Sequence, residues 1–179
     1  IANCLVGSEM CIRDRFRYPR GNGIGVDLPS IDEKIEIGKG RVIKEGKKIA
    51  IINFGARLSE CLMASENLSK KGVNPTIVDA RFAKPLDENL FWQIATDHEA
   101  IISIEEGSIG GFGSHLSHFL SEKNLIDNSL KFKSMILPDT FIDHDKPDIM
   151  YKNAGLDARN IENKVFDTLN SKVIIKKSN

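Results

Sequence analysis

Residues 101–120 read IISIEEGSIGGFGSHLSHFL, and this stretch decides the fold. The run at 101–104 has the length and the β-branched apolar residues of a buried strand. The glycines that follow give the backbone the freedom that a sharp turn needs: Gly107, Gly110, Gly111 and Gly113. Ser114 is the expected N-terminal cap of a helix. The buried face of that helix is predicted from apolar residues at helical spacing: Leu116, Phe119 and Leu120. A strand that enters a helix through glycines is typical of a parallel α/β sheet.

Two carboxylates, Glu105 and Glu106, stand where this strand should end. Ligands usually bind at the carboxyl ends of the strands in an open α/β sheet, so an acid–base pair deserves consideration. Adjacent strand residues point to opposite faces of a sheet, however, and the two groups should not converge. A structural role, such as accepting hydrogen bonds from amides of the glycine turn, is favoured.

A regular alternation of strands and helices surrounds the central stretch from residue 41 onward. The other expected strands are 41–44, 48–54, 76–80 and 132–137. The other expected helices are 57–71, about 88–97, a short one from Lys146-Pro147 to about Asn153, and about 158–170, which Asp157 should cap. The pattern predicts an α/β fold of three layers, with a mainly parallel sheet of about five strands flanked by helices.

The bulk composition excludes several classes of protein. The chain has 179 residues, with 25 basic and 25 acidic side chains, so its charge favours neither a nucleic-acid nor a membrane partner. No apolar run approaches the roughly 18 residues of a membrane span. The three cysteines, Cys4, Cys11 and Cys61, lack metal-binding spacing and are typical of a reduced, cytoplasmic chain. Cys61 falls on the apolar face of a helix and is interpreted as a core residue.

Other candidate groups carry weaker signals. His115 and His118 share a helix face with Glu122, but two histidines and one glutamate are a weak zinc pattern. Ser108 and Ser114 lack the flanking glycines of a nucleophile elbow. The polar segment 143–145 permits a histidine–aspartate pair, although a solvated loop is favoured.

Two arginines are the candidate anion-binding residues. Arg20 stands in a rigid Pro-Arg-Gly turn, from which its guanidinium could fork onto a phosphate. Arg81 follows a predicted strand at its carboxyl end, where ligands of such sheets bind. Each could instead be an ordinary surface or ion-pair arginine.

Several strings in this order resemble one enzyme family. They are FRYPRGNGIGVDLP at 16–29, RFAKPLD at 81–87, EEGSIGGFGSH at 105–115 and LPDTFIDH at 137–144. From residue 16 to about residue 170, the chain closely resembles the 1-deoxy-D-xylulose-5-phosphate synthases. The resemblance covers the end of their pyrimidine-binding domain and their C-terminal, transketolase-like domain.

The resemblance implies an enzyme that condenses pyruvate with glyceraldehyde 3-phosphate and releases carbon dioxide, in the non-mevalonate route to isoprenoids. It implies thiamine diphosphate and magnesium as cofactors and a homodimer as the assembly. In the family the diphosphate and metal site, and the glutamate that activates the cofactor, lie upstream of the matched region. This chain by itself is therefore expected to be inactive and to bind neither cofactor. Arg20, and with it Arg81, would hold the substrate phosphate.

The resemblance, together with the composition of the two ends of the chain, predicts a domain organisation. Residues 1–15 are expected to be a non-native or disordered segment, and 16–37 the end of the pyrimidine-binding domain with its linker. Residues 38–170 are expected to form the transketolase C-terminal-like domain, and 171–179 a tail. Two alternatives remain open: the C-terminal domain of a 2-oxoacid dehydrogenase β subunit or of a transketolase, and a non-catalytic interaction module.

Overall fold

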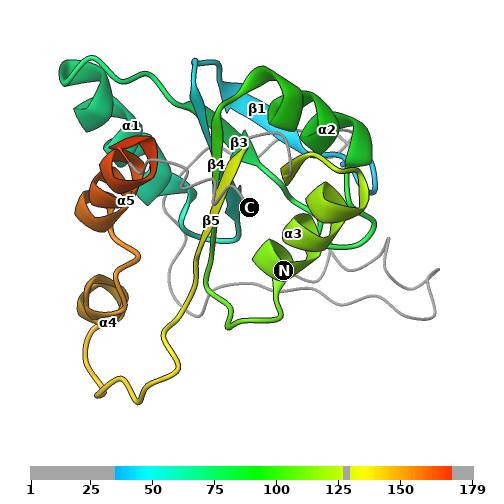
Figure 1. The fold of residues 1–179 in the computed structure, drawn as a ribbon. Coiled ribbons are helices and arrows are strands. Elements are labelled where there is room, and N and C mark those ends of the chain that lie inside the picture. The colour runs from blue at the N-terminus through cyan, green and yellow to red at the C-terminus, as the bar shows by residue number, and fades with distance from the viewer. Residues whose placement is uncertain (1–34, 127–129, 171–179) are drawn as a thin grey trace, which may run out of the picture.

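The computed structural model describes residues 35–126 and 130–170, and these residues contain a single five-stranded sheet. The strands follow the order β1-β3-β2-β4-β5 across the sheet (Figure 1). Their bounds are β1 Arg41–Lys44, β2 Ile49–Phe54, β3 Thr76–Asp79, β4 Ala100–Glu105 and β5 Lys131–Met135. Strand β1 runs antiparallel to β3, and the other neighbouring pairs are parallel. The predicted segments 1–15 and 171–179, most of 16–37, and Arg20 lie outside the described residues.

Helices cover both faces of the sheet (Figure 1). Helices α1 (Leu58–Lys70) and α5 (Ala158–Asn170) pack on one face, and α2 (Glu88–Asp97) and α3 (Phe112–Glu122) pack on the other. The short helix α4 (Pro147–Asn153) precedes α5. The prediction of a three-layer α/β fold with a mainly parallel sheet is confirmed.

The central strands β2 and β4 are apolar along almost their whole length because both of their faces are covered. Ile49 and Ile51 of β2 face the α1 and α5 layer, whereas Ala50 and Ile52 face the α2 and α3 layer. All four side chains are fully buried. Burying one such isoleucine stabilises a fold by about 1.5–3 kcal/mol, so these two strands are the centre of the hydrophobic core.

The joint between β4 and α3 differs from the prediction in one respect. Ser114 is not the N-terminal cap, because α3 already begins at Phe112. The Glu105 carboxylate, at the end of β4, accepts hydrogen bonds from the backbone N–H groups of Phe112 (3.0 Å) and Gly113 (2.8 Å). Any side chain at Gly111 would collide with that carboxylate. The hydroxyl of Ser114 instead accepts a bond from the Gly110 amide at 2.9 Å.

Within 35–126 and 130–170, none of the helices has the length and apolar character needed to cross a membrane.

Candidate functional site

The candidate site lies where the chain leaves β3 at the carboxyl edge of the sheet. Arg81 stands two residues beyond Asp79, the last residue of β3, and its φ is +56°. The Phe82 N–H donates to the carbonyl oxygen of Ala80, which closes a tight turn around Arg81. A positive φ costs a residue with a side chain about 1–3 kcal/mol, and such strain clusters at functional positions.

Asp79 connects Arg81 to the neighbouring strand β1. Its Oδ1 accepts a bond from the Arg81 backbone N–H at 3.3 Å, which supports the strained turn. Its Oδ2 accepts from both Nε and Nη2 of Arg41, each at 3.0 Å. Arg41 reaches Asp79 because the antiparallel register places these two residues opposite each other.

The Arg81 guanidinium is less tightly held than that of Arg41. Its Nε lies 3.9 Å from Asp79 Oδ2, beyond hydrogen-bond distance, and the side chain is 26% exposed. The cluster of Arg41, Asp79 and Arg81 contains two cations and one carboxylate, so it carries excess positive charge. Within 35–126 and 130–170 the Arg81 guanidinium makes no hydrogen bond, so these contacts leave its donors available to an anion at the sheet edge where such ligands usually bind.

The segment that leads into β1 is fastened beside this cluster. Asp87 caps α2 by accepting from the Leu90 N–H at 3.2 Å, and its second oxygen accepts from the Gly40 N–H at 3.1 Å. Lys39 lies 3.8 Å from the same carboxylate. These contacts hold the residue before Arg41 against the start of α2.

The two glutamates at the end of β4 are not brought together as an acid–base pair. Glu105 is buried and bound to backbone amides, as the structural interpretation predicted. Glu106 accepts from Arg57 Nε at 2.8 Å, and the Arg57 guanidinium stacks over the Tyr151 ring at 3.8 Å. Both carboxylates therefore have structural partners, and Arg57, at the start of α1, contacts both Glu106 and Tyr151 of α4.

Of the remaining candidates, His118 lies at the surface and Cys61 lies in the core. His118 faces Glu122 at 3.6 Å on the exposed side of α3. No group of three or more histidine, cysteine, aspartate or glutamate side chains within 35–126 and 130–170 could hold a metal ion. Cys61 is a core residue as predicted, and burial beside the charge of Glu60 raises the pKa of its thiol to about 12.

The residues that the structure describes do not form a site that fits thiamine diphosphate with magnesium. The described chain offers no metal-binding group of side chains, and the carboxylate of Glu105 already occupies the start of α3. A phosphate at that helix end would meet the buried charge of Glu105.

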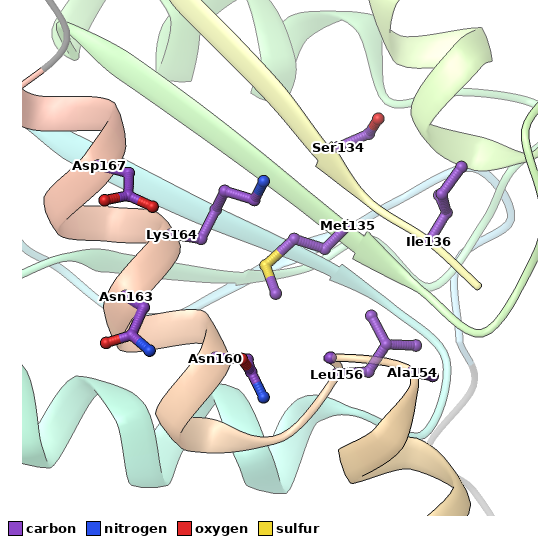
Figure 2. Close-up of a pocket in the computed structure, with 10 residues that line it drawn as sticks. Ser134, Met135, Ile136, Ala154, Leu156, Asn160, Asn163, Lys164 and Asp167 are labelled. Carbon is purple, nitrogen blue, oxygen red and sulfur yellow. The ribbon is translucent and has the colours of Figure 1, made fainter. Parts of the chain in front are cut away.

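A groove of about 350 Å³ lies beside β5, away from the candidate site, and its other wall is formed by α5 and the loop between α4 and α5 (Figure 2). Met135 extends from β5 toward α5, and the polar side chains of Asn160, Asn163 and Lys164 line the α5 wall. It contains none of the arginines at the β3 edge, and it is separate from the candidate site.

Arg81 remains a predicted anion-binding residue, and its contact with Asp79, which Arg41 also binds, was not predicted from the sequence. The Asp-Ala-Arg spacing was visible in the sequence as a local signal for Asp79. Nothing local pointed to Arg41, because its partner lies 38 residues away and is set by strand register.

The comparisons with known proteins agree with this fold. The family model described as "Transketolase, C-terminal domain" matches residues 38–161, more than half of the chain. A solved split-gene transketolase, described as an inactive beta4 tetramer, superposes with a TM-score of 0.71 at 30% identity. That match covers 80% of this chain but only 46% of the other, so the chain spans less than half the length of that protein.

More distant transketolases share the fold alone. The enzyme from Campylobacter jejuni subsp. jejuni NCTC 11168 superposes with a TM-score of 0.54 at 16% identity, covering 73% of this chain and 18% of that one. A Pichia stipitis transketolase mutant gives a TM-score of 0.53 at 14% identity, covering 74% and 18%. The chain belongs to the transketolase C-terminal domain family, as the matched family model and the 30% identical split-gene transketolase show.

Proposed function

We propose that this chain is the C-terminal part of a thiamine-diphosphate-dependent synthase that makes 1-deoxy-D-xylulose 5-phosphate. The reaction condenses pyruvate with glyceraldehyde 3-phosphate and releases carbon dioxide. The strings YPRG, RFAKPLD, EEGSIGGFGSH and LPDTFIDH support this activity over that of other members of the family. The proposed enzyme is a cytoplasmic homodimer that uses thiamine diphosphate and magnesium, both held outside the described residues.

The observation that carries the proposal is the conformation of Arg81. A non-glycine residue at φ +56° keeps a guanidinium at the ligand edge of the sheet, with Asp79 too distant to occupy its donors. The planar guanidinium can donate two parallel hydrogen bonds to the oxygens of a phosphate. Arg81 would bind and orient the phosphate of glyceraldehyde 3-phosphate, and Arg20 would be its partner in that role.

The test replaces Arg81 in the full-length enzyme. We expect Arg81→Ala to lower kcat/KM for glyceraldehyde 3-phosphate about 10- to 100-fold, because a charge-assisted hydrogen bond contributes on the order of 1.5–3 kcal/mol. The KM for pyruvate should change little, since pyruvate has no phosphate. Arg81→Lys should recover only part of the loss, because an ammonium cannot form the bidentate contact.

The exposed Arg159 of α5 provides a matched control, and Arg159→Ala should leave the kinetic constants for both substrates unchanged. If Arg81→Ala left the triose-phosphate kinetics unchanged, Arg81 would be a structural turn residue and its proposed role would fail. If Arg20→Ala left the triose-phosphate kinetics unchanged, the proposed role of Arg20 as the partner of Arg81 would fail.

A transketolase activity is the second candidate, because the split-gene transketolase is 30% identical over 80% of this chain. The two reactions differ in their products. Release of carbon dioxide from pyruvate supports the synthase, whereas transfer of a two-carbon unit from a ketose phosphate, without carbon dioxide, supports the transketolase.

A further inference from the structure

We infer that Arg41 is a positioning residue for Arg81: by binding the Asp79 carboxylate, it leaves the Arg81 guanidinium available to a phosphate. This inference rests on the proposed phosphate-binding role of Arg81. It assigns a function to a residue of β1 that does not need to touch the substrate.

The contacts of Asp79 divide unequally between the two arginines. Both Nε and Nη2 of Arg41 lie 3.0 Å from Oδ2, whereas the Nε of Arg81 lies 3.9 Å from the same oxygen. Arg81 donates a hydrogen bond to the carboxylate only through its backbone N–H, at Oδ1, and its guanidinium forms a longer ion pair with Oδ2. Asp79 thus supports the turn of Arg81 through the main chain while its charge is taken up by Arg41.

Removing Arg41 would leave the Asp79 charge without its close partner. The Asp79 side chain is only 14% exposed, so water would compensate that charge poorly. Among the described contacts of Asp79, Arg81 supplies the other cation, and a small rotation would close the 3.9 Å gap. Arg81 would then be bound within the protein, and a phosphate would have to displace the carboxylate.

The position of Arg41 is itself well defined. It stands at the first residue of β1, opposite Asp79 in the register, and the preceding residue is bound through the Gly40 N–H to Asp87. The rival explanation is that Arg41, which is 49% exposed, contacts the phosphate directly. The two explanations differ in the effect of removing Arg41 once Asp79 is neutralised: binding is not weakened if Arg41 acts through Asp79, and it is weakened if Arg41 contacts the phosphate.

The experiment measures binding of glycerol 3-phosphate, a stable phosphate monoester, to the 179-residue chain. Dissociation constants come from the backbone amide resonances of residues 80–83, at constant ionic strength. The variants are Arg81→Ala, Arg41→Leu, Asp79→Asn and the double variant Arg41→Leu/Asp79→Asn. An asparagine retains an oxygen for the Arg81 N–H, so this substitution removes the charge and keeps the turn.

We expect Arg41→Leu to weaken binding about 10-fold, equivalent to about 1.4 kcal/mol. Asp79→Asn should bind at least as tightly as the unmodified chain. The double variant should bind like Asp79→Asn, because there is no longer a carboxylate to capture Arg81. A double variant as weak as Arg41→Leu alone would overturn the inference and show that Arg41 contacts the phosphate. Unchanged binding by Arg41→Leu would overturn it as well.

A different result would contradict the proposed function itself. If Arg81→Ala bound glycerol 3-phosphate as tightly as the unmodified chain, Arg81 would not be the phosphate-binding residue. If Arg41→Leu does not fold, Arg41→Lys gives the same comparison, since lysine keeps the charge but loses the two-nitrogen contact. Arg41→Lys should lose less affinity than Arg41→Leu, and that loss should again disappear in the double variant with Asp79→Asn. A loss that persists in that double variant would contradict the inference.

Discussion

At the residue scale, Glu105 shows how one buried side chain defines a turn. Its two oxygens accept from the amides of Phe112 and Gly113, and the residue is 1% exposed. The carboxylate also lies at the positively polarised start of α3, where negative charge is favourable. Glu105 therefore acts as the cap that α3 lacks in its own sequence.

We predict that Glu105→Gln destabilises the protein by about 1–3 kcal/mol, because the amide group of glutamine would turn a donor toward one of these N–H groups. The measurement is the free energy of unfolding from urea denaturation at pH 7. Glu122→Gln, at an exposed position on α3, the helix that Glu105 caps, is the matched control and should change little. Equal stability of the two variants would show that the carboxylate is not needed.

Glu162 makes stability depend on pH. Burial opposes its ionisation, but hydrogen bonds from Lys71 (2.6 Å) and Asn67 (2.8 Å), with the charges of Lys71 and Arg159, outweigh burial. The pKa of the Glu162 carboxyl is therefore lowered. Since the unfolded chain titrates at the ordinary glutamate value of about 4.3, this residue stabilises the fold above that pH. The contribution is lost as the pH falls through the lower pKa of the folded state.

We predict that Glu162→Gln is less stable than the unmodified chain at pH 7, by about 1 kcal/mol. The difference should shrink as the pH falls below about 4, because the native carboxyl then becomes protonated too. Urea denaturation of both proteins between pH 3 and pH 7 measures it. A difference that stays constant over this range would rule out the linkage.

Some contacts of individual residues could be predicted from the sequence, and others could not. The role of Glu105 was predictable, because a carboxylate at a strand end precedes a turn rich in free amides. The ion pair of Arg41 with Asp79 was not predictable, because it depends on which strands pair and in which register. Local sequence contains the turn chemistry but not the neighbours across the sheet.

At the element scale, Asp87 joins two segments that the chain separates. It caps α2 through Leu90 and binds the Gly40 amide at the approach to β1. Its side chain is 8% exposed, so an unpaired amide left behind would be poorly hydrated. The start of α2 therefore fixes the start of the edge strand that carries Arg41.

We predict that Asp87→Ala costs about 1–3 kcal/mol, since it removes a helix cap and leaves the Gly40 N–H without its acceptor. Asp87→Ser should cost less, because serine can still cap α2 while losing the second oxygen. Urea denaturation ranks the variants, and hydrogen exchange of the Gly40 amide should accelerate in both. Slow exchange of that amide in either variant would disprove the connection.

Helix and strand positions were largely predictable because hydrophobic periodicity and turn residues carry them. Helix α2 occupies 88–97 as predicted, and Asp157 caps α5 by accepting from the Asn160 N–H at 3.0 Å. The start of α3 was misplaced because its cap comes from seven residues upstream, outside the range of local capping rules. Strand β5 ends at Met135, two residues before the predicted end.

At the scale of the whole molecule, the fold class was predictable because each central strand is apolar on both faces. Such strands require helices above and below, and the βα alternation supplies them. The antiparallel pairing of β1 with β3 adds an edge that alternation alone does not specify. The candidate site lies at this joint between the parallel sheet and its antiparallel edge.

We predict that the chain binds no thiamine diphosphate in the presence of magnesium at micromolar concentrations. The groups of side chains that hold a metal are absent from 35–126 and 130–170, and Glu105 fills the start of α3. Calorimetric titration of the chain is the measurement, with the full-length enzyme as the positive control. Saturable heat from the chain itself would refute this prediction.

The strained turn at Arg81 affects which substitutions selection should favour at this position. Glycine or asparagine adopts φ +56° at little cost, so either would relieve the backbone where arginine does not. A population of variants selected for thermal stability alone should therefore lose the arginine at position 81 early. Under selection for the proposed capture of a phosphate substrate the arginine should persist, at the expense of a less relaxed backbone.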